Sequence, residues 1–105
     1  MIISLLHSLP ARRSPLHTTV IYDSVDCAQL LLTAGADPNR RCDSQRAKRR
    51  TPLHVAAREG KCALVRLLLC YGADIELEDA EGRNAVDLAE EHGHLETQQV
   101  GRVWI

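Results

Sequence analysis

Apolar residues fall into short clusters at helical spacing. Leu53, Ala56 and Ala57 make a narrow apolar stripe on a short helix. Leu64, Val65 and the run at 67–69 give a second helix a broader apolar face. Small alanines permit close approach and leucines fill the remaining space. The pattern therefore predicts a packed pair of helices.

Polar and special residues mark the ends of both helices. Thr51 is a hydroxyl residue at the first helix start, where it can accept from unpaired backbone N–H groups. Pro52 suits the first helical position because its missing N–H is not needed there. Gly60 and Gly72 can adopt the left-handed conformation that ends a helix. The sequence thus predicts where each helix begins and ends.

The helix pair recurs along the chain. Ser14-Pro15-Leu16-His17 lies 37 residues before the start of the central unit, and Asn84-Ala85-Val86-Asp87 lies 33 residues after it. Leu30-Leu31-Leu32 repeats the later leucine triplet. A helix pair of this size cannot bury its apolar faces alone, so neighbouring units must stack.

The stretch Thr51-Pro52-Leu53-His54-Val55-Ala56 matches the T-P-L-H-x-A signature of the ankyrin repeat. The chain resembles ankyrin-repeat proteins over residues 12–100, with about two full repeats and a degenerate third. This resemblance implies an all-α ankyrin-repeat solenoid, in which helix-turn-helix units stack and β-hairpin-like fingers join them.

The resemblance divides the chain into three parts. Residues 1–11 are expected to form an N-terminal capping segment, with a remnant of a preceding repeat as the alternative. Repeats are expected at 12–44, 49–81 and, in part, 82–100. Val100, Gly101 and Arg102 stand where the second repeat has its leucine triplet. We therefore expect residues 101–105 to be a tail unrelated to the repeat.

The four cysteines indicate free thiols. No two of them have the spacing of a zinc knuckle or a redox pair. Cys27, Cys62 and Cys70 fall on predicted helices and should be protected, whereas Cys42 falls in a loop and should be exposed. Free thiols favour the cytoplasm, and the basic segment described below extends this expectation to the nucleus.

Residues 1–10 are apolar but too short to span a membrane, so no membrane insertion is expected.

Catalytic, cofactor and metal sites are not expected. The chain has no G-x-S-x-G, H-E-x-x-H or Gly-rich phosphate loop. The resemblance implies that His17 and His54, which occupy the same position in two repeats, are structural residues that link neighbouring units. His92-Gly93-His94 could suggest a metal pair, but His94 falls where the repeat pattern ordinarily has His. We therefore predict a protein that is not an enzyme.

Charge is distributed unevenly. Residues 1–50 carry a net charge of +4, and residues 51–105 carry −5. The basic excess is concentrated at residues 40–50, the first connecting finger, which is four residues longer than the next one. One interpretation is a solvated loop that tolerates insertion. The other is a contact for an acidic partner, a phosphate-bearing ligand or an import receptor. Internal pairing with the acidic segment 74–79 is a third interpretation.

The resemblance implies that a partner binds at the finger tips and at the exposed edge of each first helix. The predicted contact residues are Ile21, Tyr22, Arg46, Lys48, Arg49, Arg50, Arg58, Glu59, Glu81 and Arg83. The predicted function is a monomeric protein-interaction module, a small scaffold or adaptor that binds another protein. The alternative is a regulatory module in which the basic finger is the active element. Sequence-specific nucleic-acid binding is not expected, since no known DNA-binding motif or aromatic stacking platform accompanies the charge.

Overall fold

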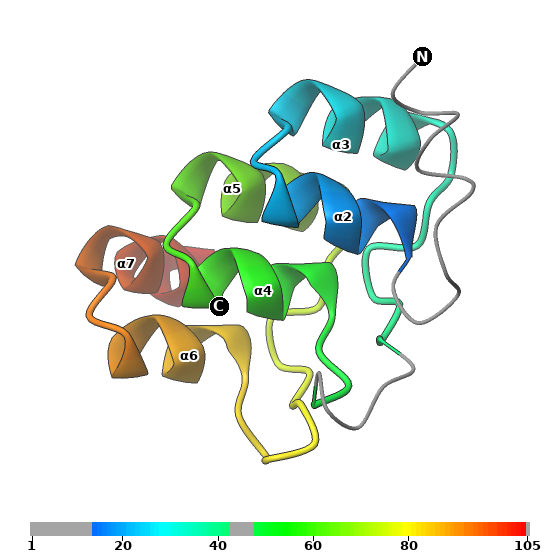
Figure 1. Ribbon diagram of the computed structural model, residues 1–105. Helices are drawn as coiled ribbons and strands as arrows, with labels where there is room; N and C mark the ends of the chain where they lie inside the picture. The colour runs from blue at the N-terminus through cyan, green and yellow to red at the C-terminus, as the bar shows by residue number, and fades with distance from the viewer. Residues whose placement is uncertain (1–13, 43–47, 105) are drawn as a thin grey trace.

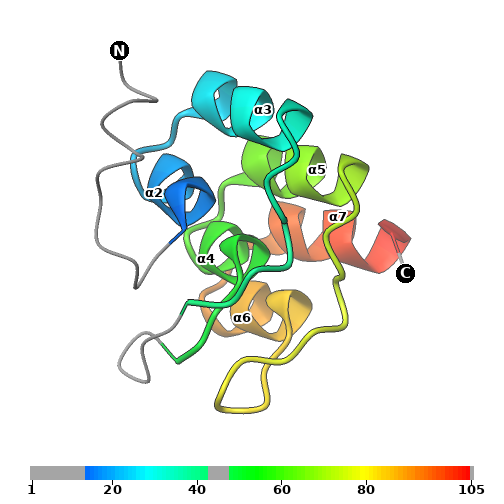
Figure 2. The same ribbon diagram turned by 90° about the vertical axis from the view of Figure 1, so that its right-hand side faces the viewer.

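Three pairs of short helices stack side by side in the computed structural model, which describes residues 14–42 and 48–104 (Figure 1). The first helices of the pairs are α2 (Pro15–Ile21), α4 (Pro52–Arg58) and α6 (Ala85–Glu91). The second helices are α3 (Val25–Thr33), α5 (Cys62–Cys70) and α7 (Leu95–Trp104). Each set forms one layer, and the connecting fingers extend from one side of the stack (Figure 2). The predicted all-α solenoid is confirmed.

The core lies between the two helix layers and between successive pairs. Leu16, Leu53 and Leu88 come from the first layer and are almost wholly buried. Leu64 and Leu68 contribute from the central helix α5 and have no exposed surface. Because α5 packs against both α3 and α7, its leucines fill the middle of the stack.

Each first helix begins with the same reciprocal cap. The Thr51 hydroxyl accepts from the His54 N–H at 3.3 Å, and the Thr51 N–H donates to His54 Nδ1 at 3.0 Å. Ser14 with His17, and Asn84 with Asp87, form equivalent caps. Three different residue pairs therefore satisfy the same backbone groups at the start of each repeat.

Two histidines also link successive repeats, as the family resemblance implied. His17 Nε2 lies 2.7 Å from the Arg50 carbonyl, and His54 Nε2 lies 2.8 Å from the Leu77 carbonyl. Since His54 Nδ1 accepts from a backbone N–H, Nε2 carries the proton and donates to the carbonyl. Each of these side chains thus joins its own helix to the finger that follows.

Gly60 must be glycine for two reasons. Its φ of 70° lies in the left-handed region, which ends α4. A Cβ atom at this position would lie 2.5 Å from His94 Nδ1, and His94 Nε2 in turn contacts the Arg58 carbonyl at 2.9 Å. The turn of the second repeat is therefore fitted against the turn of the third.

The expected tail is wrong for residues 101–104, because α7 continues through Trp104. Gly101 occupies the position of Leu68 and is buried. A Cβ atom there would lie 2.6 Å from Val86 Cγ2, so glycine lets α7 pack directly against α6. Close packing replaces the lost leucine and retains the helix. The predicted capping segment, residues 1–11, lies outside the described residues.

The expected exposure of Cys42 is also wrong. Its N–H donates to the Arg50 carbonyl at 2.9 Å, which places residue 42 in the neck of the finger, where its side chain is buried. Cys27 is buried as expected and Cys62 is half-buried. The expected protection of Cys70 is wrong, because this last residue of α5 is exposed.

Replacing Leu68 should destabilise the stack strongly. We expect Leu68→Ala to lower the free energy of unfolding by about 2–5 kcal/mol, because it removes buried methyl groups and leaves a cavity. The matched control is Leu30, the first leucine of the triplet 30–32, whereas Leu68 is the second leucine of its triplet. The Leu30 side chain is 55% exposed. Leu30→Ala should change the unfolding free energy by about 0.5 kcal/mol or less. Urea unfolding followed by circular dichroism measures both. Equal losses would contradict the assigned core.

Protonation of His54 should weaken the fold in mild acid. Burial lowers the pKa of His54 below its ordinary 6.5, outweighing the opposite effects of its hydrogen bonds to Leu77 and Arg83 and of nearby Asp79. The unfolded chain then binds the proton more readily. The stability from neutral His54 is fully present above pH 6.5 and is lost as pH falls from there through the lowered folded pKa. Urea unfolding at several pH values should show this loss, and His54→Gln should remove the His54 part. His92→Gln, at an exposed position, should retain it.

Thiol reactivity should follow exposure. Brief alkylation of the native protein should modify Cys70 first and leave Cys42 unmodified, because a buried thiol is not accessible to the reagent. Mass spectrometry of the digested protein identifies the modified positions. Faster modification of Cys42 than of Cys70 would show that the neck of the finger is open in solution.

Candidate functional site

The ends of the first helices and the fingers form the candidate surface. Among the predicted contact residues, Ile21 and Tyr22 lie at the end of α2, and Tyr22 is 75% exposed. Their counterparts in the second repeat are Arg58 and Glu59 at the end of α4. The first repeat therefore presents an apolar and aromatic pair where the second presents two charges.

The charges on α4 neutralise each other. Arg58 Nη1 lies 3.0 Å from Glu59 Oε1, and both side chains are exposed. Such a surface pair contributes little to stability, about 0–1 kcal/mol. Arg58 and Glu59 thus form one exposed dipole rather than two separate charged sites.

Lys48 and Arg50 of the basic finger pair with acidic residues of the next finger. Lys48 Nζ lies 2.8 Å from Glu81 Oε1, and Arg50 Nε lies 3.1 Å from Asp79 Oδ2. The Arg50 side chain is only 13% exposed. Internal pairing with the acidic segment 74–79, one of the three interpretations of the finger, is therefore present for Arg50, whereas Lys48 pairs with Glu81 just beyond that segment. Arg46 lies outside the described residues.

Asp79 organises the second finger. Its side chain accepts from the backbone N–H groups of Glu81 and Arg83 and from Arg50 Nε. Burial by itself would raise the pKa of Asp79, but these three hydrogen bonds and the Arg50 charge outweigh it and lower the pKa. Asp79 therefore stays ionised and holds the turn closed. Lys48 likewise lowers the pKa of Glu81, chiefly through their hydrogen bond.

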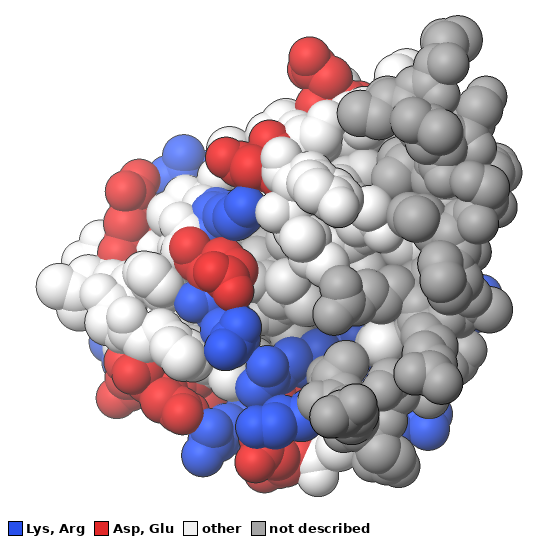
Figure 3. All heavy atoms as spheres, in the orientation of Figure 1, with Lys and Arg blue, Asp and Glu red and all other residues white. Residues whose placement is uncertain are grey.

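The Arg83 side chain pairs with Glu91 at the end of α6. Its Nη1 atom lies 2.6 Å from one Glu91 oxygen and 2.8 Å from the other. Both side chains are exposed, so a partner could contact the pair without breaking it. Figure 3 shows the general result: basic and acidic side chains lie side by side over the face made by the first helices and fingers. Among the described residues on this face, neither sign of charge dominates.

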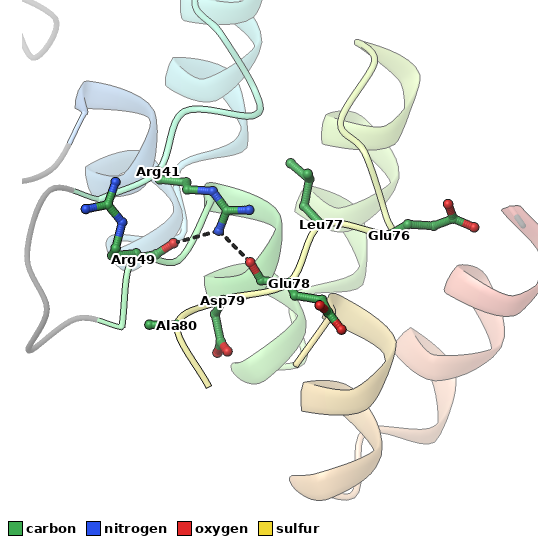
Figure 4. Close-up of a pocket in the computed structure, with 7 residues that line it drawn as sticks. All are labelled: Arg41, Arg49, Glu76, Leu77, Glu78, Asp79 and Ala80. Carbon is green, nitrogen blue, oxygen red and sulfur yellow. Dashed lines mark hydrogen bonds between the residues drawn. The ribbon is translucent and has the colours of Figure 1, made fainter. Parts of the chain in front are cut away.

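The two fingers enclose an open groove of about 540 Å³, lined by Arg41, Arg49 and residues 76–80 (Figure 4). Arg41 joins its walls, because Nη1 donates to the Arg49 carbonyl at 3.3 Å and also to the Glu78 carbonyl. The Ala80 N–H donates to the Lys48 carbonyl at 2.8 Å. These bonds hold the fingers together along the groove.

Sequence reasoning missed the roles of Arg41, Leu77 and Asp79. Arg41 was counted only within the basic segment, although an arginine can bridge two carbonyls where a lysine makes a point contact. An acidic residue followed by a glycine, as in Asp79-Ala80-Glu81-Gly82, is typical of a turn held by its first side chain. That signal could have identified Asp79. The groove itself depends on how two fingers meet, which a single repeat does not encode.

The described residues contain no group of three or more His, Cys, Asp or Glu side chains that could hold a metal ion. Within the same residues, every helix is too short or too polar to cross a membrane. Four cations of this surface, Lys48, Arg50, Arg58 and Arg83, are paired with carboxylates of the chain.

Comparison with known proteins identifies the repeat. The model of the family described as ankyrin repeats (3 copies) matches residues 16–100. Ankyrin repeat and SOCS box protein 11 of Homo sapiens is 38% identical over 85 residues, which cover 79% of this chain and 24% of that protein. Inversin of Gallus gallus is 42% identical over 80 residues, covering 76% of this chain and 7% of inversin. Rabankyrin-5 of Homo sapiens is 36% identical over 104 residues, covering 88% and 9%.

The chain thus spans about a quarter or less of the length of these relatives. The matched residues include the caps at Thr51 and Asn84, the linking histidines and the leucine-rich helices α3 and α5 described above. The chain belongs to the ankyrin-repeat family.

Proposed function

We propose that this chain is a non-catalytic interaction module that binds a partner protein across the ends of its first helices and its fingers. The observation that carries the proposal is the exposure of Tyr22, 75%, beside the exposed Ile21. Aromatic side chains often dominate the binding energy of protein interfaces. The family membership supports a protein partner, and a small scaffold or adaptor is the role we propose.

The surrounding charges support Tyr22 as the anchor. Arg58 with Glu59, and Arg83 with Glu91, are already paired within the chain. A partner that covers these pairs gains little from them, since exposed ion pairs have small net energies. It gains more by burying Tyr22 and Ile21, because apolar burial contributes about 25 cal/mol per Å². The charged rim then fixes orientation more than affinity.

The histidines support a non-catalytic role. The Nε2 atoms of His17, His54 and His94 all lie within hydrogen-bond distance of backbone carbonyls. His54 Nδ1 also accepts from the Thr51 backbone N–H. A histidine with both ring nitrogens engaged in the fold is poorly placed to transfer protons to a substrate. These residues serve the architecture of the repeat.

The alternative function, with residues 40–50 as an import signal or phosphate contact, has less support. Lys48 and Arg50 would have to leave Glu81 and Asp79 before a receptor could bind them.

The four free cysteines support a reducing compartment, which includes both the cytoplasm and the nucleus. We propose the cytoplasm as the principal location and a monomer as the binding species.

Tyr22 should contact the partner directly. A photo-crosslinking phenylalanine analogue at position 22 should capture a defined protein in cells, because the side chain at this position is exposed at the proposed interface. With the captured protein purified, Tyr22→Ala should raise the dissociation rate roughly tenfold or more, as expected for an aromatic anchor. Surface plasmon resonance measures the rate.

Tyr71 supplies the matched control. It is also an exposed tyrosine, but it follows α5 in the second layer and its hydroxyl lies 3.2 Å from Thr33 Oγ1. The crosslinker at position 71 should not capture the same protein, and Tyr71→Ala should leave its dissociation rate unchanged. Equal capture and equal rates at both positions would contradict the proposed surface.

A further inference from the structure

The groove between the fingers has free charges of opposite sign at its two ends. Arg49 lies on the first finger, whereas the Glu76 and Glu78 carboxylates point toward the other end, with Leu77 between them (Figure 4). In the part of the chain that the structure describes, none of these three charged side chains makes a hydrogen bond or an ion pair. Lys48, Arg50 and Asp79 are paired within the fingers, so pairing has left a polarised groove.

Arg49 lies at the rim of this groove in a strained backbone conformation. Lys48 and Arg49 have φ angles of 59° and 51°, in the left-handed region that residues with a Cβ atom rarely adopt. This conformation is unfavourable for Lys and Arg, because their Cβ atoms crowd the backbone. Three contacts maintain it: Ala80 N–H to the Lys48 carbonyl, Lys48 to Glu81, and Arg41 to the Arg49 carbonyl. Strain that the surroundings maintain in this way is often found at binding sites.

The walls of the groove are also fixed before any partner binds. Arg41 donates to carbonyls of both fingers, and the Leu77 carbonyl accepts from His54 beneath it. A preformed site lowers the entropy lost on binding. The half-buried Leu77 side chain offers an apolar contact between the two charged ends.

We propose that the groove binds an extended segment of a partner protein that presents an acidic residue to Arg49 and a basic residue to Glu76 and Glu78. An apolar residue of that segment lies over Leu77. A segment with only acidic or only basic residues is repelled at one end, so the opposed charges select for this pattern. This inference rests on the proposed function, because it names the chemistry of the partner segment.

A capped peptide, Gly-Asp-Ala-Leu-Ala-Lys-Gly, tests the groove directly. Titrated into the isotopically labelled chain, it should shift the amide resonances of Arg49, Leu77, Glu78 and Ala80 saturably. The association should weaken between 50 and 300 mM salt, since screening shortens the range of exposed charges. A second peptide with Asn and Gln in place of Asp and Lys should bind more weakly. Equal binding of both peptides, or no saturable shift at these amides, would overturn the inference.

Variants separate charge from fold. Arg49→Gln should weaken peptide association about two- to fivefold, the range expected for one exposed ion pair. Arg49→Lys should retain most of the affinity, because the charge remains. Arg58→Gln is the matched control, since Arg58 is an exposed arginine paired with Glu59 outside the groove lining. Binding that Arg49→Gln and Arg58→Gln reduce equally would also overturn the inference.

Tyr22→Ala distinguishes failure of this inference from failure of the proposed function. Peptide binding should be unaffected by that change, since Tyr22 does not line the groove. The captured partner should depend on both Tyr22 and Arg49. A partner that depends on Tyr22 but binds equally well to Arg49→Gln would overturn the groove inference and leave the proposed function standing.

Discussion

Each helix pair has apolar surface that only a neighbouring pair can bury, and the whole structure depends on this constraint. Leu53 of the central repeat and Leu16 of the first are closed off from solvent, with α2 packed on α4 and α4 on α6. Repeats of this kind are stabilised by nearest-neighbour interfaces rather than by one central core. The fingers and the groove keep their geometry because the helices beneath them are fixed in this way.

Buried histidines connect the packed first helices to the fingers. His54 caps its own helix with Nδ1 and reaches the carbonyl of Leu77 in the next finger with Nε2. The same Leu77 lines the groove. A buried side chain in the first layer thus sets the position of a backbone segment that a partner could contact. The neutral imidazole therefore links the stability of the helix cap to the geometry of the groove.

The sequence predicted the repeated units well and the surface less well. Caps at Thr51 and Ser14 and the turn at Gly60 follow from local chemistry, which a sequence pattern records directly. Cys42 and Gly101 were predicted wrongly, because the environment of Cys42 depends on Arg50 across the neck of the finger and that of Gly101 on Val86 of α6. Gly101 has low helix propensity, yet the close approach of Val86 makes it the residue that fits. Tertiary packing overrode the local preference.

The charged surface shows why counting charges does not identify a binding site. The basic finger has a large excess of Lys and Arg in the sequence, but Lys48 and Arg50 are paired with the acidic finger that follows. Among the described residues, Tyr22 is exposed at the end of α2, and Arg49 is exposed between two paired cations, Lys48 and Arg50. We propose that the few exposed positions left unpaired, rather than the total charge, discriminate among partners.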